Sequence, residues 1–237
     1  MAGLDLLPEI LFEDAAILVV NKPAGLLSLQ DGYDKMLPHL STVLSPEYGR
    51  LWMVHRLDRE TSGVIILARS AEAHHHLNDQ FRDRLVKKVY HALAAHIPSW
   101  SEQLVDAPLR KNGDRRHRTV VDWVRGKPAQ TEFRIIEIFA DFVLMEARPH
   151  TGYTHQIRAH ASWLGLPLAG DGLYGSGIPI CGPASPETGL PQAPILNRPA
   201  LHALSITFQH PISGQPVSFT APYPEDFCKA LAFLRVY

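Results

Sequence analysis

Residues 54–63 carry the side chains best suited to chemistry, because charged and small polar residues stand there directly before an apolar run. Asp58 lies between two arginines in this segment. A guanidinium beside a carboxylate keeps it ionised and fixes its direction, and a nearby cation lowers such a pKa by about 1 to 3 units. A fixed anion of this kind can serve as a nucleophile or a general base. The alternative is that Asp58 only closes a turn through its side chain, with help from Thr61 and Ser62.

Residues 148–160 form a second candidate segment at the junction of a predicted strand and a predicted helix. Gly152 permits a tight turn, and Thr151 or Thr154 can cap the helix that follows. Arg158 lies about one helical turn beyond Thr154, so its guanidinium can reach a cleft at the edge of the sheet.

Two sets of histidines raise the question of a metal site. His150, His155 and His160 are five positions apart, which does not place them on one helical face, and no HExxH pattern is present. The consecutive histidines at 74–76 point in different directions on a helix and cannot share one ion. We therefore expect local hydrogen bonds or solvent at these positions, and no metal.

Tyr90 follows two lysines and a valine early in a predicted strand. A tyrosine at such a position is most often a core aromatic with its hydroxyl group at the rim. In the functional interpretation its ring stacks against a base in a pocket.

Hydrophobic periodicity predicts the elements that must position these side chains. Residues 71–85 are predicted to be a helix because Leu77, Phe81 and Leu85 recur every four positions. Residues 30–50 have weak periodicity and predict a loop with a little helix, and residues 175–199 are rich in Pro and Gly and predict a surface insertion. The expected strands are 17–20, 64–68, 89–96, 131–139, 142–148, 201–208 and 217–220, the expected helices are 71–85, 154–164 and 226–236, and an extended loop or hairpin tip is expected at 110–118. This order predicts an α+β domain around a largely antiparallel sheet.

Composition limits the class of protein. The chain has 237 residues, of which 46% are hydrophobic and 20% charged, as in an ordinary globular protein of one large domain or two small ones. Its two cysteines, Cys181 and Cys228, have no CxxC spacing, which argues against a structural zinc site and favours a reducing compartment. No signal peptide or membrane-spanning run is recognisable, so we expect a cytoplasmic protein. A monomer is the default expectation.

The net charge of −1 is unusual for a protein that binds nucleic acid. Basic residues are nevertheless dense in two places, at residues 82–88 and 110–118. These clusters either bind phosphate or are simply two solvated faces.

Together these segments resemble the RluA-type family of RNA pseudouridine synthases across nearly the whole chain. The matching strings are VNKPAGLLS (20–28), HRLDRETSG (55–63), KKVYHAL (87–93), KPAQTEF (127–133), TGYTHQIRAH (151–160), GDGLYG (170–175), LHA (201–203) and AP (221–222). The resemblance implies the pseudouridine synthase fold: a single catalytic domain over residues 1–237, a mixed, largely antiparallel sheet with flanking helices, and no separate N-terminal RNA-binding domain of the S4 type.

The resemblance also implies roles for individual residues. Asp58 takes the place of the family's catalytic carboxylate, Tyr90 that of the aromatic that stacks on the target base, and Arg158 that of the arginine that pairs with the catalytic Asp. Arg56 corresponds to the arginine associated with displacing that base. The other substrate-binding residues expected from the matched motifs are His55, Thr61, His155 and Gln156. Tyr153 departs from the pattern, since the family usually has Arg there, and this puts the identity of the substrate in question.

Such an enzyme would isomerise uridines in structured RNA, either tRNA or large-subunit rRNA or both, with eversion of the target base. The reaction neither oxidises nor hydrolyses, so no metal or other cofactor is expected, and RNA is the expected partner. Two alternatives belong to other classes. A non-catalytic RNA-binding or ribosome-assembly factor could keep the fold, although the intact Asp, Tyr and Arg argue against it. A metal-dependent hydrolase could use the histidines, although their spacing is unfavourable.

Overall fold

A computed structural model describes residues 7–175, 177–182 and 193–236. It divides into two compact units. Unit 1 takes Met1–Val89 and His202–Pro222, and unit 2 takes Tyr90–Leu201 and Tyr223–Tyr237. The border therefore falls inside two strands, β5 (Lys87–Ala95) and β13 (Leu201–Gln209).

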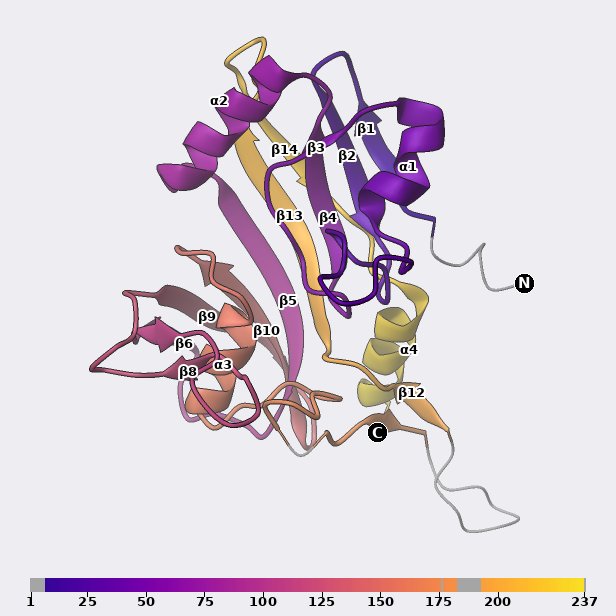
Figure 1. Ribbon diagram of the computed structural model, residues 1–237. Coiled ribbons are helices and arrows are strands. Elements are labelled where there is room, and N and C mark those ends of the chain that lie inside the picture. Colours follow the sequence, from indigo (N-terminus) through magenta and orange to yellow (C-terminus); the bar gives the residue numbers. More distant parts are fainter. Residues whose placement is uncertain (1–6, 176, 183–192, 237) are drawn as a thin grey trace. The chain divides into compact units, whose positions relative to one another are not determined.

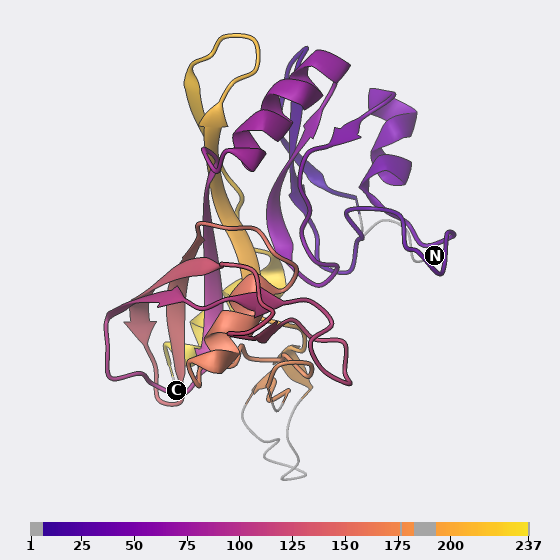
Figure 2. The same ribbon diagram turned by 60° about the vertical axis from the view of Figure 1, so that its left-hand side comes forward.

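The sheet of unit 1 is built around β4 (Ser62–Ala68), the apolar run predicted as a central strand, whose seven residues are all buried. Antiparallel β2 (Ile17–Lys22) pairs with β4, and β13 pairs with it in parallel. Gly63 makes the second pairing possible, because its φ is +116° and a Cβ there would lie 2.2 Å from the carbonyl oxygen of Ala203. The remaining strands of unit 1 are β1 (Glu9–Glu13) on β2, β3 (Trp52–Met53) on β4 and β14 (Pro216–Thr220) on β13, the last pair standing out in orange and yellow in Figure 2.

Two helices belong to unit 1, α1 (Leu40–Tyr48) and α2 (Ala71–Arg82). The helix predicted to reach residue 85 ends at Arg82, because Arg84 adopts a left-handed φ of 59°. The main-chain N–H of Leu85 then bonds the carbonyl of Gln80 at 2.9 Å, which closes the helix as in a Schellman motif. Leu85 lies outside the helix and is 58% exposed, so the predicted extension of the helix to residue 85 is wrong.

Unit 2 contains an antiparallel sheet in the order β5, β10 (Phe142–Pro149), β9 (Gln130–Ile138) and β6 (Glu102–Asp106). The side chains of β5 alternate between two cores. Ala92 and Ala94 belong to one core with residues of α3 (Gln156–Trp163). Leu93 belongs to the other with residues of α4 (Glu225–Leu234). Helix α3 thus covers one face of the sheet and α4 the other (Figure 1).

The described part of unit 2 also contains two short antiparallel strand pairs. Strands β7 (Leu109–Arg110) and β8 (Val120–Val121) flank the basic residues 111–119, so the hairpin tip predicted there is confirmed. Strands β11 (Ile180–Cys181) and β12 (Pro194–Leu196) pair within the segment predicted as a patternless insertion, of which residues 176 and 183–192 lie outside the described part.

The predicted α+β class and the mixed, largely antiparallel sheet are confirmed, since only the β4–β13 pair is parallel among the strand pairs described within the two units. No helix in the described part of the chain combines the length and apolar character needed to cross a membrane.

Candidate active site

The loop that carries Asp58 is anchored by a buried lysine. Lys22, the last residue of β2, is completely buried. Its ammonium group donates hydrogen bonds to the carbonyl oxygens of Pro23 at 2.8 Å, Leu26 at 2.8 Å and Arg59 at 3.1 Å. An ammonium has three donors, so these three carbonyls can use them all. Lys22 therefore ties the turn after β2 to the loop that precedes β4.

Further hydrogen bonds hold the chain on both sides of residue 58. The main-chain N–H of Gly25 donates to the carbonyl of Arg59 at 2.9 Å, and the Arg59 Nε donates back to Gly25 at 3.0 Å. The Ser28 hydroxyl donates to the carbonyl of Leu57 at 2.8 Å and accepts its N–H at 3.1 Å. The positions next to half-buried Asp58 are thus fixed by hydrogen bonds to the main chain of Gly25 and the side chain of Ser28, both in a separate loop.

Asp58 itself begins a turn, because its carbonyl oxygen accepts the N–H of Thr61 at 3.1 Å. Thr61 is only 3% exposed. The next residue, Ser62, contacts Nδ1 of His202 at 3.0 Å, and His202 Nε2 bonds the carbonyl oxygen of Ala221 at 3.2 Å. A carbonyl can only accept, so the proton is on Nε2 and the Ser62 hydroxyl donates to Nδ1. Buried partners therefore hold the start of β4, directly after the turn.

His55 is a structural support of the same loop. Its Nε2 accepts the main-chain N–H of Ile66 at 3.0 Å, and its ring stacks on Phe81 at a centroid distance of 4.8 Å. Burial, assisted by the nearby charge of Lys88, lowers the pKa of His55 to about 3. The ring is therefore neutral at physiological pH, with its proton on Nδ1. Arg56, the next residue, is exposed.

In unit 2, Arg158 is held by a carboxylate to which the sequence analysis gave no role. Its Nε donates to one oxygen of Asp171 at 2.7 Å and its terminal nitrogen to the other at 2.8 Å. Asp171 is fully buried and Arg158 is 8% exposed. Such a bidentate pair fixes the plane of the guanidinium as well as its position.

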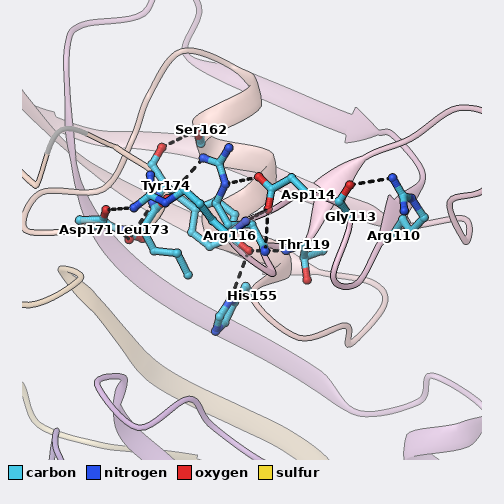
Figure 3. Close-up of polar contacts among 12 residues, drawn as sticks. Arg110, Gly113, Asp114, Arg116, Thr119, His155, Ser162, Asp171, Leu173 and Tyr174 are labelled. Atoms are coloured by element: carbon cyan, nitrogen blue, oxygen red, sulfur yellow. Dashed lines mark hydrogen bonds and ion pairs between the residues drawn. The ribbon is translucent and has the colours of Figure 1, made fainter.

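Tyr174 connects this pair to the β7–β8 hairpin, and Figure 3 shows Tyr174 with its partners Asp171, Thr119 and His155. The Arg158 guanidinium lies 4.9 Å from the centre of the Tyr174 ring. The Tyr174 hydroxyl accepts the main-chain N–H of Thr119 at 2.8 Å and lies 3.1 Å from Nδ1 of His155. Burial raises the pKa of Tyr174, so the phenol keeps its proton and can donate it to His155.

The start of α3 differs from the predicted cap. His155 occupies the cap position with a left-handed φ of 55° and no side-chain cap bond, so capping by Thr151 or Thr154 is wrong. The Thr151 hydroxyl instead donates to Oε1 of Gln156 at 2.7 Å, and the Gln156 amide donates to Gln130 and Thr131, both at 2.9 Å. Gln156 is only 3% exposed, so its bonds tie α3 to β9.

Tyr90 is half-buried in β5, where it packs against the core that includes Phe133, Ala147 and Ile157. This position fits both a core aromatic with a rim hydroxyl and a ring available for stacking.

The sequence-predicted site residues fall into both units. Asp58, Arg56, His55 and Thr61 belong to unit 1, and the others belong to unit 2, where Arg158 and His155 meet at Tyr174. The pairing of Arg158 with Asp58 stays a prediction. Sequence reasoning missed Lys22, Asp171 and Tyr174, although all three lie in the matched strings NKPAG and GDGLYG.

Over residues 7–175, 177–182 and 193–236, no group of three or more His, Cys, Asp or Glu is placed to hold a metal ion. His160 contacts the Thr131 hydroxyl and the Ala107 carbonyl at 2.9 and 3.0 Å, the kind of local hydrogen bonding predicted for these histidines.

Comparison with known proteins shows what the chain is similar to. Residues 16–163 match the family described as RNA pseudouridylate synthase. The chain is 40% identical over 214 residues to the dual-specificity RNA pseudouridine synthase RluA of Escherichia coli (strain K12), an alignment covering 90% of this chain and 92% of that protein. It is 36% identical over 235 residues to the ribosomal large subunit pseudouridine synthase D of Pseudomonas aeruginosa, covering 96% of this chain and 72% of that protein. The solved structure of human RNA pseudouridylate synthase domain containing 4 matches with a TM-score of 0.75 and 28% identity, covering 96% of this chain and 93% of that one.

Proposed function

Because this chain belongs to the RNA pseudouridylate synthase family, we propose that it isomerises specific uridines of structured RNA, with Asp58 as the essential carboxylate. The relative named for the large ribosomal subunit supports large-subunit rRNA as a substrate, and the relative named as a dual-specificity RNA enzyme supports a second RNA. The sequence resemblance implies tRNA as that second RNA. The expected location is the cytoplasm. The observation that carries the role of Asp58 is the anchoring of its loop on both sides by Lys22 and Ser28.

The reaction breaks the N1–C1′ bond of uridine, turns the uracil and joins C5 to C1′. One proton leaves C5 and one is added to N1, so nothing is oxidised or reduced. Asp58 acts either as a nucleophile at C1′ or as a base that removes a ribose proton. Both routes require a carboxylate in a fixed position, and the anchored loop favours that position.

The target base must leave its stack, at a cost of a few kcal/mol. Tyr90 stacks on the everted uracil, a contact that contributes about 1 to 3 kcal/mol. The exposed side chain of Arg56 is available to occupy the vacated space. Arg158, whose guanidinium is fixed by Asp171, takes the role that the family resemblance implies, that of the arginine that pairs with the catalytic carboxylate.

The remaining predicted site residues act through others. The burial of Thr61 and Gln156 supports positioning roles for both. His55 supports the Asp58 loop through its hydrogen bond with the Ile66 N–H and its stacking on Phe81. His155 supports Tyr174, which lies against Arg158.

The test compares Asp58→Asn with Glu60→Gln, which removes an exposed carboxylate from the same loop. Unmodified tRNA and large-subunit rRNA transcripts are incubated with each variant, and pseudouridine is mapped by carbodiimide labelling and primer extension. We expect Asp58→Asn to fold normally by circular dichroism and to form no pseudouridine, whereas Glu60→Gln keeps its activity. A fully active Asp58→Asn enzyme overturns the assignment. The same mapping in cells with and without this gene identifies the uridine.

A further inference from the structure

Positive charge is concentrated in one short stretch of unit 2. Residues 109–127, which we call the basic hairpin, hold seven Lys and Arg and two Asp, a net charge of +5. The remaining 218 residues then carry −6, since the whole chain carries −1. The basic hairpin is thus a local cationic surface on an otherwise acidic protein, as expected for a site that binds phosphate.

The basic hairpin is fastened to the segment that holds Arg158. A terminal nitrogen of Arg116 donates to the carbonyl of Gly172 at 2.7 Å, and Arg118 donates to the carbonyl of Leu173 at 3.3 Å (Figure 3). The Thr119 bond to the Tyr174 hydroxyl lies beside them. A ligand on the basic hairpin is therefore bound to a segment that is hydrogen-bonded to residues 172–174, next to the Asp171 that holds Arg158.

A tight turn at the end of the basic hairpin displays two adjacent apolar side chains. Trp123 is 68% exposed and Val124 is 91% exposed. Tryptophan is highly buried on average, and aromatic residues are enriched at interfaces.

The turn that carries Trp123 is held rigidly. One carboxylate oxygen of Asp122 accepts the main-chain N–H groups of Val124 at 3.0 Å and Arg125 at 2.9 Å, and the other binds the Arg110 guanidinium. These main-chain bonds are the main reason that the pKa of Asp122 is lowered. The carbonyl oxygen of Asp122 accepts the N–H of Gly126 at 2.8 Å. A Cβ on residue 126 would lie only 2.3 Å from this oxygen, so the turn requires glycine there. Trp123 is therefore presented by a turn that needs no ordering on binding.

From these observations we propose that Trp123 is a stacking platform for an unpaired nucleobase of the RNA substrate, separate from the target uridine. The exposed cations of the same hairpin, including Lys111, Arg115 and Lys127, bind the adjoining phosphates. An aromatic ring beside basic groups is the arrangement with which proteins bind single-stranded RNA. This inference rests on the proposed function, because it concerns the same substrate.

The experiment measures RNA affinity and catalysis separately. The probes are an oligouridylate of about 12 nucleotides and the same oligomer with abasic sugars, which keeps the phosphates and removes the bases. We expect Trp123→Ala to bind oligouridylate about 5- to 150-fold more weakly than the wild type, the range for loss of one stacked base. Trp123→Phe should lose less. The affinity of Trp123→Ala for the abasic oligomer should equal that of the wild type.

Two control variants separate stacking from charge and from general damage. Trp163→Ala removes another exposed tryptophan of unit 2, at 52% exposure, and should leave affinity unchanged. Lys127→Gln should reduce the slope of log affinity against log salt by about 0.7, whereas Trp123→Ala should leave that slope unchanged. With saturating RNA transcript, the single-turnover rate of Trp123→Ala should equal that of the wild type, because Trp123 has no part in the proposed chemistry.

The inference is overturned if Trp123→Ala binds oligouridylate as the wild type does, or if Trp163→Ala loses as much affinity. It is also overturned if sedimentation shows that Trp123→Ala converts a dimer into a monomer without weakening RNA binding, since the turn is then a contact between two copies. The proposed function fails by a different result, namely a wild-type protein that forms no pseudouridine.

Discussion

Replacing Asp171 by Asn tests whether the buried ion pair with Arg158 stabilises the site. The carboxylate receives two hydrogen bonds from the guanidinium, and one of its oxygens also accepts the N–H groups of Leu173 at 3.0 Å and Tyr174 at 3.1 Å. An asparagine oxygen can still accept the two main-chain N–H groups. Its NH₂ group then faces the guanidinium, donor against donor, and the charge of Arg158 loses its partner.

The magnitude follows from burial. The side chains of Asp171 and Arg158 are 0% and 9% exposed, so solvent cannot replace the lost interaction. Removing one member of a buried pair costs about 3 to 5 kcal/mol. A domain is stable by about 5 to 15 kcal/mol, so this is a large share of the total. For a chain of this length the corresponding fall in Tm is about 6 to 20 °C.

The assay is a double-mutant cycle of urea unfolding for Asp171→Asn, Arg158→Met and the double variant. The double variant should recover much of the lost free energy, because no uncompensated charge is left buried. Glu225→Gln is the control in the same unit, since Glu225 pairs with Lys229 at 2.6 Å but the two side chains are 81% and 64% exposed. We expect it to cost about 1 kcal/mol or less. A loss below about 1 kcal/mol for Asp171→Asn, or a double variant less stable than either single one, would refute the reasoning.

Two further predictions concern unit 1. Because the pKa of folded His55 is about 3, below the 6.5 of the unfolded chain, the unfolded state binds more protons between these values. The contribution of neutral His55 to the free energy of unfolding is complete above pH 6.5. Between pH 6.5 and about pH 3 it falls by about 1.4 kcal/mol for each unit of decreasing pH. His55→Gln, which can still accept the Ile66 N–H, should therefore show a shallower acid limb in urea unfolding at stepped pH; an unchanged slope contradicts the assignment. Lys22→Met leaves three carbonyls without their donor, so we expect the free energy of unfolding to fall by about 3 kcal/mol or more and the single-turnover rate to be reduced. The control, Lys229→Met, changes an exposed lysine and should alter neither quantity. A fully active and stable Lys22→Met protein would show that the anchor is dispensable.

Periodicity predicted the elements whose burial is regular. The run at 64–68 became β4 because all its residues are buried, and the strand predicted at 142–148 became β10, whose residues 143–147 are buried between two cores. It missed β1, β3 and β6, which are short or mostly exposed and carry little apolar pattern. Helix ends were misplaced where a non-glycine residue takes a left-handed φ, at Arg84 and at His155, since a sequence gives no sign of such a residue.

The site was predictable where a side chain carries a recognised motif and was hidden where a partner is supplied by tertiary structure. Asp58 and Arg158 were found through their strings. Lys22 was not singled out because lysines are almost never fully buried without partners, and its partners come from two loops. Asp171 follows Arg158 by thirteen positions. Neither the helical nor the strand repeat predicts contact at this spacing, so the pair could not be inferred from the sequence.

Units 1 and 2 each hold a predicted catalytic residue, or its loop, through a buried charged side chain, and the two buried charges have opposite signs. In unit 1 a buried ammonium binds main-chain carbonyls on both loops next to Asp58, and in unit 2 a buried carboxylate binds the guanidinium of Arg158. Both buried charges order groups before any RNA arrives, so their loss should lower the rate of the bound complex more than its affinity. Trp123 stands on an exposed turn, where its loss should lower affinity and leave that rate unchanged. We therefore expect Lys22→Met and Asp171→Asn to lower mainly the single-turnover rate, and Trp123→Ala to lower mainly the RNA affinity. This expectation is wrong if the three variants alter both quantities in the same proportion.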